Sequence, residues 1–300
     1  MAGVVCVGIA VMDQVFAVGD LPVRPGKHFA TAFTEVGGGP AATAAVTVAK
    51  LAGKARFWGR VGNDPTGARI LAELSAWGVD TSTVRRVAGG RSSVSAVLVD
   101  RRGERTIVAY ADPGLDTDPS WLPLGALDER TTGAVLGDVR WPAGTAAALK
   151  AARDAGLPAI LDADSSPDDQ AGRLMGLASH AVFSEPALQA TAGTDDLAEG
   201  LRRIGRQTGA WVAVTAGGEG CLWLDGDSVR RMPAFAVEAV DTLGAGDVFH
   251  GAFALALLEG QSLPAALRFA AAASAVKVTR FGGSATAPTR AEVEAMLAKG

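Results

Sequence analysis

Short runs of apolar residues alternate along the chain with longer stretches in which apolar residues recur at helical spacing. The short runs predict strands at residues 4–9, 55–61, 135–137, 159–162, 180–183, 211–215 and 220–224. The longer stretches predict helices at residues 40–51, 67–77, 145–155, 247–258 and 263–278. This alternation of strand and helix indicates a mostly parallel sheet with helices on both faces.

Two stretches break the alternation. Residues 15–33 and 92–110 show the alternating positions of β-ribbons, with no helix between. In the second stretch Ser93, Ser95 and Val97 alternate with Val94, Ala96 and Leu98. We expect a single α/β domain of residues 1–300, in which inserted segments at about 13–34 and 91–112 form a small β-sheet lid. Such a lid would cover the C-terminal edge of the main sheet, where α/β folds bind ligands.

Composition limits the classes of protein to consider. The chain has 28 Lys and Arg against 32 Asp and Glu, a net charge of −4, which argues against a nucleic-acid partner. Two cysteines exclude a disulfide framework and favour a reducing compartment, and the three histidines show no metal-ligand spacing. No apolar run reaches the roughly 18 residues of a membrane span, and no basic stretch marks a signal peptide. We therefore expect a soluble, cytoplasmic protein without a membrane partner.

The sharpest chemical signal is the run Asp-Thr-Leu-Gly-Ala-Gly-Asp at 241–247, which leads into a predicted helix. Small residues at a helix start let backbone N–H groups approach an anion. A carboxylate beside such amides can take a proton from a hydroxyl while the amides stabilise a phosphoryl group in transfer. A second interpretation stays open on the run alone, in which Asp247 caps the helix and the glycines form a turn.

The run and the small residues after it, Gly251 and Ala252, resemble the signature of the PfkB carbohydrate-kinase family, the relatives of ribokinase. The resemblance covers nearly the whole chain and implies a ribokinase-like α/β fold, ATP as phosphoryl donor and Mg²⁺. It implies that Asp247 is the general base and that Asp241 lies near a monovalent-cation site in members that use one. It also implies an anion hole formed by the backbone of Gly244, Ala245 and Gly246.

The resemblance also implies sites for the sugar and the nucleotide. Asp13, after the first strand, would accept hydrogen bonds from sugar hydroxyls, and the sugar-binding turn would include Gly38 and Gly39. Thr43 stands where the family usually has Asn. ATP phosphates would meet the loop that contains Thr215, Gly217, Gly218 and Gly220, although a hairpin needs the same glycines. The run 270–277 with 280–283 matches the helix beside the adenine, but tight helix packing is the simpler explanation of its alanines.

One departure concerns the metal. Many members carry an Asn-x-x-Glu motif that organises magnesium and phosphate, and this chain has Ser184 and Ala187 at those two places. Ser184 would still lie at the nucleotide, and Glu185 could substitute in the outer shell of a Mg²⁺ held mostly by ATP and water. The segment Asp162-Ala163-Asp164 resembles the family's Asp-x-Asn strand end, again with a changed last residue.

Two cations, Lys27 and Arg140, lie where the sugar end should be, and Arg140 next to Trp141 could clamp an anion. A surface lysine and a salt-bridged arginine is the other interpretation. The segments at 36–45, 138–141, 183–186 and 247–251 most resemble the bacterial sulfofructose kinases of sulfoglycolysis, which phosphorylate 6-deoxy-6-sulfofructose at O1. Ala109 departs from that subgroup, where we expect a polar Asn.

Other functions remain as alternatives. The substrate could be fructose phosphate, 2-keto-3-deoxygluconate or a neutral sugar or nucleoside. A different class is a nucleotide- or sugar-sensing module without catalysis, but a pure binder gains nothing from a base beside the anion hole. Because lid sheets in this family often pair across a dimer, we expect a homodimer.

Overall fold

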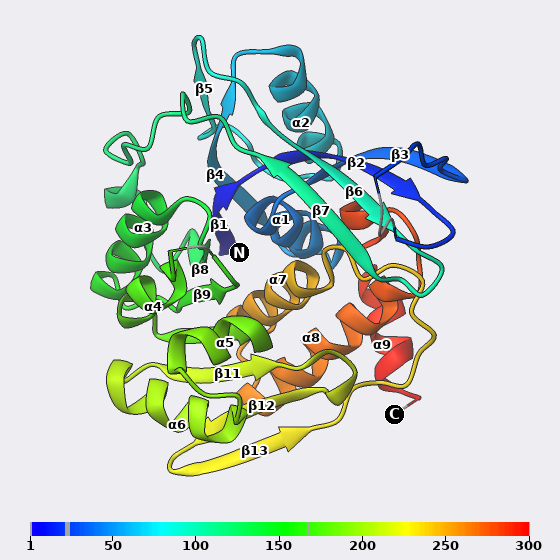
Figure 1. Cartoon of the computed structure of the whole chain (residues 1–300). Coiled ribbons are helices and arrows are strands. Elements are labelled where there is room, and N and C mark those ends of the chain that lie inside the picture. Colours follow the sequence, from blue (N-terminus) through cyan, green and yellow to red (C-terminus); the bar gives the residue numbers. More distant parts are fainter. Residues whose placement is uncertain (1, 22–24, 167, 300) are drawn as a thin grey trace.

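The computed structural model describes residues 2–21, 25–166 and 168–299. Within these residues a large sheet lies between two layers of helices, and a second, smaller sheet lies apart from it, at the upper right of Figure 1. In spatial order the large sheet comprises β13 (Ser228–Met232), β12 (Cys221–Asp225), β11 (Trp211–Thr215), β10 (His180–Ser184), β9 (Ala159–Ala163), β8 (Thr132–Asp138), β1 (Gly3–Ile9), β4 (Ala55–Gly62) and β5 (Arg85–Val87). The strands from β11 to β5 are parallel, and β12 and β13 add an antiparallel edge.

Two hydrophobic clusters form the core, one on each face of the large sheet. Successive strand residues point to opposite faces, so Val4 and Cys6 belong to one cluster and Val5 and Val7 to the other. The first cluster packs against α1 (Pro40–Lys50), α2 (Pro65–Ala76), α7 (Ala245–Leu258), α8 (Leu263–Val278) and α9 (Arg290–Leu297). The second packs against α3 (Pro142–Asp154), α4 (Gln170–Leu174), α5 (Glu185–Ala192) and α6 (Leu197–Thr208).

The small sheet has the strand order β3 (Ala32–Gly38), β2 (Val11–Ala17), β6 (Ser93–Val99) and β7 (Arg105–Tyr110). Its strands come from the two expected segments, but the first pair starts earlier and ends later than residues 13–34. Residues 22–24 of that stretch lie outside the described residues. Along β6, Ser93, Ser95 and Val97 are buried while their alternating neighbours are half-buried. The buried face of this strand is therefore partly polar, which a purely structural sheet does not need.

Asp138, the last residue of β8, fixes the place where the chain passes from the large sheet to the small one. Its Oδ2 accepts hydrogen bonds from the backbone N–H groups of Ile9 (2.9 Å) and Ala41 (3.2 Å). A Cβ at Gly8 would lie 2.0 Å from the same oxygen, so only glycine fits there. One buried carboxylate thus joins the end of β1 to the start of α1.

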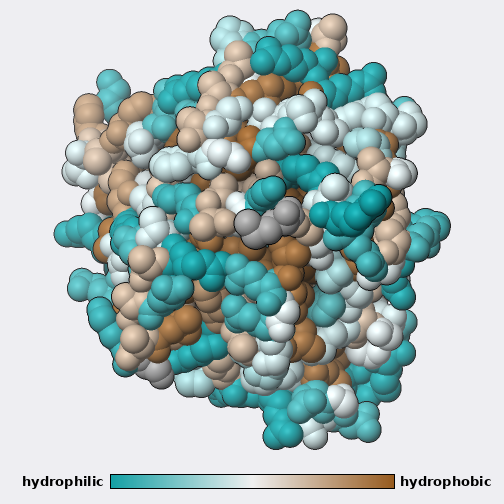
Figure 2. All heavy atoms as spheres, turned by 180° about the vertical axis from the view of Figure 1, so that it is seen from behind, coloured by the Kyte–Doolittle hydropathy of each residue, from teal (hydrophilic) through white to brown (hydrophobic). Residues whose placement is uncertain are grey.

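The predicted elements are present, with two kinds of difference. The helix expected at 247–258 begins two residues earlier, at Ala245, so Asp247 lies inside its first turn. We did not predict α4, α5, α6, α9, β5 or β13, although in α6 the apolar residues Leu197, Leu201 and Ile204 recur at helical spacing. Both cysteines are buried and unpaired. No helix within the described part of the chain is long and apolar enough to span a membrane. Seen from behind, the surface is mostly hydrophilic, with a band of hydrophobic atoms in its lower half (Figure 2).

Candidate active site

The start of α7 offers unpartnered backbone amides to an anion. Gly244 precedes the helix in the left-handed conformation (φ 75°), which glycine adopts without strain. The N–H of Ala245 donates to the carbonyl of Thr242 at 3.2 Å, so this amide, which we expected to bind phosphate, is already used. The N–H groups of Gly244, Gly246 and Asp247 have no acceptor among the described residues, and the space where Gly246 would carry a side chain is open. These amides are therefore free to bind an anion.

Asp247 lies at the third position of α7 and does not cap it. The helix has no side-chain cap, and no hydrogen bond to the Asp247 carboxylate occurs among the described residues. The capping interpretation is therefore wrong. Burial raises the pKa of Asp247 to about 8, assisted by the negative charges of Asp162 and Asp164. A carboxylate with this pKa is a strong enough base to take a proton from an alcohol as it reacts.

Three aspartates at the ends of β8 and β9 face Asp247. Asp138, Asp162 and Asp164 all influence its charge, and burial raises the pKa of Asp162 well above its usual value. The His250 ring lies among them, with Nδ1 2.7 Å from the Gly246 carbonyl and Nε2 3.5 Å from Oδ1 of Asp162. Sequence reasoning gave His250 no role, since its contacts come from elements distant in the chain.

Arg140 is held by this acidic cluster. Its guanidinium donates to Oδ2 of Asp164 at 2.9 Å, and the Ser184 hydroxyl donates to the other oxygen of the same carboxylate at 3.0 Å. Asp164 thus links two residues that we assigned to different ligands, Arg140 to the sugar and Ser184 to the nucleotide. Lys27 lies exposed in the loop between β2 and β3, on the side of the small sheet.

The small sheet places Asp13 beside Gly38, in the turn that leads into α1. Asp13 is nearly buried, and its Oδ1 accepts a hydrogen bond from the Ser95 hydroxyl at 2.5 Å. Burial raises the pKa of Asp13 to about 6, and the bond from Ser95 opposes this shift. On α1, Thr43 is buried, and a Cβ at Gly244 would lie 3.6 Å from its methyl group and 3.7 Å from Oδ2 of Asp247. Thr43 therefore lies close to the anion site.

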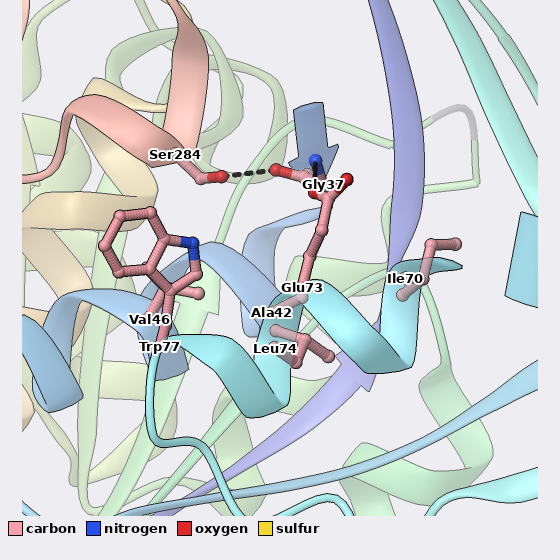
Figure 3. Close-up of a pocket in the computed structure, with 9 residues that line it drawn as sticks. Gly37, Ala42, Val46, Ile70, Glu73, Leu74, Trp77 and Ser284 are labelled. Carbon is pink, nitrogen blue, oxygen red and sulfur yellow. Dashed lines mark hydrogen bonds between the residues drawn. The ribbon is translucent and has the colours of Figure 1, made fainter. Parts of the chain in front are cut away.

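In the glycine turn next to Asp13, two side chains hold Gly37 by hydrogen bonds, and we call this pair of bonds the clamp. The N–H of Gly37 donates to Oε2 of Glu73 on α2 at 2.7 Å, and its carbonyl accepts a hydrogen bond from the Ser284 hydroxyl (Figure 3). A small cavity of about 10 Å³ lies behind this clamp, lined by Trp77 and other side chains of α1 and α2. Because both backbone groups of Gly37 are held, the position of Gly38 is fixed.

The comparisons with known proteins agree with this geometry. The sequence model of the pfkB family carbohydrate kinases matches residues 1–290. The chain belongs to the PfkB family.

Several relatives of this PfkB-family chain are named sugar kinases. It is 31% identical over 300 residues to a ribokinase of Bacillus subtilis, covering 99% of this chain and 100% of the relative. It is 30% identical over 289 residues to fructokinase-1 of Oryza sativa subsp. japonica, covering 88% and 89%. A solved structure from Agrobacterium tumefaciens, provisionally assigned as a ribokinase, matches with a TM-score of 0.94 and 42% identity, covering 99% of this chain and 98% of that one.

A further solved structure shows the phosphoryl donor of a relative. The ribokinase of Arabidopsis thaliana, in complex with ribose and ATP, matches with a TM-score of 0.84 and 28% identity, covering 99% of both chains. This chain therefore has the ribokinase-like fold and is an ATP-dependent carbohydrate kinase.

In this PfkB-family kinase the expected nucleotide loop joins β11 to β12. Side chains at Gly217 and Gly218 would meet nothing within 4 Å, which leaves the backbone open to a ligand. Gly220 has a different reason to be glycine, because its Cβ would lie 2.0 Å from the Met232 carbonyl oxygen. Thr215 donates its hydroxyl to the Phe183 carbonyl at 3.4 Å, at the same sheet edge as Ser184.

The carboxylates of the kinase fit a magnesium ion that arrives with ATP. No group of three or more His, Cys, Asp or Glu side chains within the described ranges could hold a metal by itself. Mg²⁺ commonly keeps several waters and binds one or two carboxylates together with substrate phosphates. Asp164 and Glu185, at the ends of β9 and β10, are half-exposed and suit that outer role.

At Asp241, near which we expected a monovalent cation, the structure places the ammonium of Lys277. The Asp241 carboxylate accepts hydrogen bonds from the N–H groups of Leu243 (2.8 Å), Gly282 (3.0 Å) and Gly283 (3.2 Å). The ammonium of Lys277 contacts both its Oδ2 (3.1 Å) and its backbone carbonyl (2.7 Å). Three of these donors meet Oδ2 and one meets Oδ1, so a metal cation at Oδ2 would have to displace the ammonium.

Proposed function

We propose that this kinase transfers the γ-phosphoryl group of ATP to a primary hydroxyl of a ketohexose, with Asp247 as the general base. The observation that carries the proposal is the Asp247 carboxylate, which has a pKa of about 8 and lies beside two helix amides without acceptors. A binding module would gain nothing from this arrangement, since an ionised carboxylate repels phosphate. The sensing alternative is therefore less well supported.

The reaction needs one proton transfer and one phosphoryl transfer. The sugar O–H bond breaks as Asp247 takes the proton, and the oxygen forms a bond to the γ-phosphorus while the bond to the β–γ bridging oxygen breaks. ADP leaves with that oxygen. The N–H groups of Gly246 and Asp247 bind the transferring phosphoryl oxygens, with the positive end of the α7 dipole behind them. Mg²⁺ would neutralise charge on the ATP phosphates, with Asp164 and Glu185 reaching it through water.

The sugar would bind between the small sheet and α1. Asp13 accepts hydrogen bonds from two hydroxyls, the backbone at Gly38 and Gly39 lines the turn, and Thr43 lies near the reacting oxygen. The buried serine Ser95 holds the Asp13 carboxylate in place. ATP would lie along the ends of β10 and β11, at Ser184, Thr215 and the open turn of Gly217 and Gly218, whereas Gly220 shapes the hairpin.

The finer proposal for the substrate is 6-deoxy-6-sulfofructose, phosphorylated at O1. Lys27 and Arg140 support an anionic group at the far end of the sugar, where Arg140 can offer its remaining N–H groups. In the small sheet Ala109 lies opposite Ser95, which in turn lies opposite Asp13. An Asn at 109 would stand in this row, and the alanine weakens the case for a sulfonate.

A second candidate is a neutral sugar such as fructose or ribose. Its support is that Asp164 already neutralises much of the Arg140 charge. Relatives named ribokinase and fructokinase agree with this candidate. Fructose phosphate and 2-keto-3-deoxygluconate are further alternatives with an anionic group.

The proposal includes a cytoplasmic homodimer. The strand β7 is exposed along its whole length, and Val108 is 70% and Phe33 54% exposed. A second copy could cover this outer surface of the small sheet. The buried free thiols of Cys6 and Cys221 suit a reducing compartment.

A coupled assay of ADP release tests the function directly. Wild-type protein with MgATP is given sulfofructose, fructose 6-phosphate, fructose, ribose and 2-keto-3-deoxygluconate in turn. We expect sugar-dependent ADP release, with the highest kcat/KM for sulfofructose. Higher kcat/KM for fructose or ribose would support the neutral candidate, and no release with any sugar would contradict the proposed function.

A further inference from the structure

The side chain of Lys277 has an unusual position for a lysine. Both Lys277 and its partner Asp241 are completely buried, with 0% side-chain exposure. The rest of α8 around Lys277 is rich in alanine and valine, so the ammonium has no water to solvate it. Burying a charge in this way is costly unless a partner of opposite sign compensates. The cost suggests that the charge does more than stabilise the fold.

The ammonium holds the segment that leads into the anion site. Its hydrogen bond to the Asp241 carbonyl fixes the backbone three residues before Gly244. One turn earlier on α8, the Ser274 hydroxyl donates to the Ala245 carbonyl at 3.0 Å. Residues three apart share one face of a helix, so α8 presents Ser274 and Lys277 together to the turn at 241–245. Both ends of this turn are thus attached to the same helix.

Hydrogen-bond donors surround the carboxylate of Asp241. Three backbone N–H groups and the ammonium surround its carboxylate, and the ammonium also meets its carbonyl. A second cation placed at these oxygens would lie beside the Lys277 charge and face the positive ends of the N–H dipoles. Electrostatic repulsion therefore disfavours a free cation here.

The ammonium also affects the proposed base. Asp247 is among the negative charges that favour the charged form of Lys277, although burial of the lysine lowers its pKa. The ammonium lies near the turn at 241–245 and therefore adds positive electrostatic potential at the start of α7, where Asp247 lies and where the phosphoryl group would bind. A bound monovalent ion at the same place would supply a charge of the same sign and size.

We propose that the ammonium of Lys277 acts as a built-in monovalent cation, so that the kinase needs no free K⁺ or Na⁺ to order the turn at 241–245. Lys277 is a positioning residue, since it acts through Asp241 and the amides of the turn. The inference rests on the proposed kinase function for its catalytic readout. Its structural readout does not depend on that function.

The test compares wild type with Lys277→Ala in chloride salts of K⁺, NH₄⁺, Na⁺ and tetramethylammonium at constant ionic strength. For wild type, we expect kcat to differ less than twofold between the four salts, beyond general salt effects. Its Tm should differ by less than about 2 °C between them. For Lys277→Ala, we expect kcat in tetramethylammonium to fall at least about tenfold. K⁺ or NH₄⁺, which fit the vacated space, should restore at least part of the loss and raise Tm. Lys150→Met, which removes an exposed ion pair with Asp154, is the matched control and should behave as wild type.

Activation of wild type more than about threefold by K⁺ over tetramethylammonium, or a matching rise in its Tm, would overturn the proposal. If Lys277→Ala does not fold, Lys277→Met/Asp241→Asn removes both charges and keeps similar volumes. Full kcat in that double variant would show that the ammonium is not needed. If no sugar supports turnover in any salt, the proposed function has failed, and the Tm series still decides the cation proposal.

Discussion

Gly38 and Asp13 pack so closely that residue 38 can carry no side chain. A Cβ at Gly38 would lie 1.9 Å from Oδ2 of Asp13, well inside van der Waals contact. The carboxylate that we assign to the sugar is therefore shaped by the glycine turn, while Ser95 holds its other oxygen.

Replacing this glycine should weaken sugar binding selectively. We expect Gly38→Ala to displace Asp13 and lower kcat/KM for the sugar by about 10- to 100-fold, the worth of a charge-assisted hydrogen bond. The Kd for MgATP, measured by isothermal titration calorimetry, should change less than twofold. Gly176→Ala is the control, since a side chain there would meet nothing within 4 Å. Unchanged sugar kinetics in Gly38→Ala would remove Asp13 from the sugar site.

The clamp on Gly37 predicts a change in KM rather than kcat. Glu73→Gln and Ser284→Ala each weaken one of the two hydrogen bonds that hold this residue (Figure 3). We expect each to raise the sugar KM about three- to tenfold, with kcat within a factor of two, because the reacting groups do not move. Initial-rate kinetics over a range of sugar concentrations give both constants. A fall in kcat at unchanged KM would contradict the assigned role.

The raised pKa of Asp247 predicts the pH dependence. Only the ionised form can accept a proton, so kcat/KM should rise with pH up to about 8 and then level off. The raised pKa of Asp13, about 6, should add a further loss of kcat/KM below that pH. Asp162→Asn removes a negative charge that raises the Asp247 pKa, so its profile should level off at a lower pH than that of wild type. A wild-type profile already level at pH 6 would contradict the assignment.

Arg140 separates the two substrate candidates. For a sulfonated or phosphorylated sugar, we expect Arg140→Ala to raise KM at least about tenfold, because a charged hydrogen bond is lost. For a neutral sugar the same change should leave KM within about threefold. The control is Arg101→Ala, since this arginine forms an exposed pair with Asp20. An equal effect of Arg140→Ala on both kinds of sugar would mean that Arg140 acts through Asp164 alone.

The sequence shows the alternation of strands and helices and the catalytic run because these signals are local. The spacing of Ile70, Leu71 and Leu74 predicts α2, and all three are buried. Short or weakly apolar elements were missed; α5, for example, has eight residues, of which only Ala187 and Leu188 are buried. Their helical form depends on tertiary packing more than on periodicity.

Residues that act across the fold could not be predicted. The role of Asp138 depends on bonds to Ile9 and Ala41, about 100 or more residues away in sequence. The sequence does give a signal for Lys277, which is the one charged residue in the alanine-rich part of α8 after Arg268. That signal indicates a buried partner but does not identify Asp241, because the turn that carries it meets α8 only in the folded chain.

The central claim is that Asp247 removes the proton from the sugar hydroxyl. Asp247→Asn keeps the shape of the side chain and removes the base. Burial raises the pKa of Asp247 from its usual value of 3.8 to about 8, so the folded chain loses stability as pH rises through that range, and the loss is complete above it. The variant has no such group to ionise, so at pH 8.5 its Tm should equal or exceed that of wild type. That result would show that the variant is folded.

The most direct measurement is kcat of Asp247→Asn at pH 8.5 in the ADP-release assay, with the Kd for MgATP measured on the same sample. We expect kcat to fall at least ~100-fold while the Kd changes less than threefold. Turnover within tenfold of wild type would contradict the claim that Asp247 is the base.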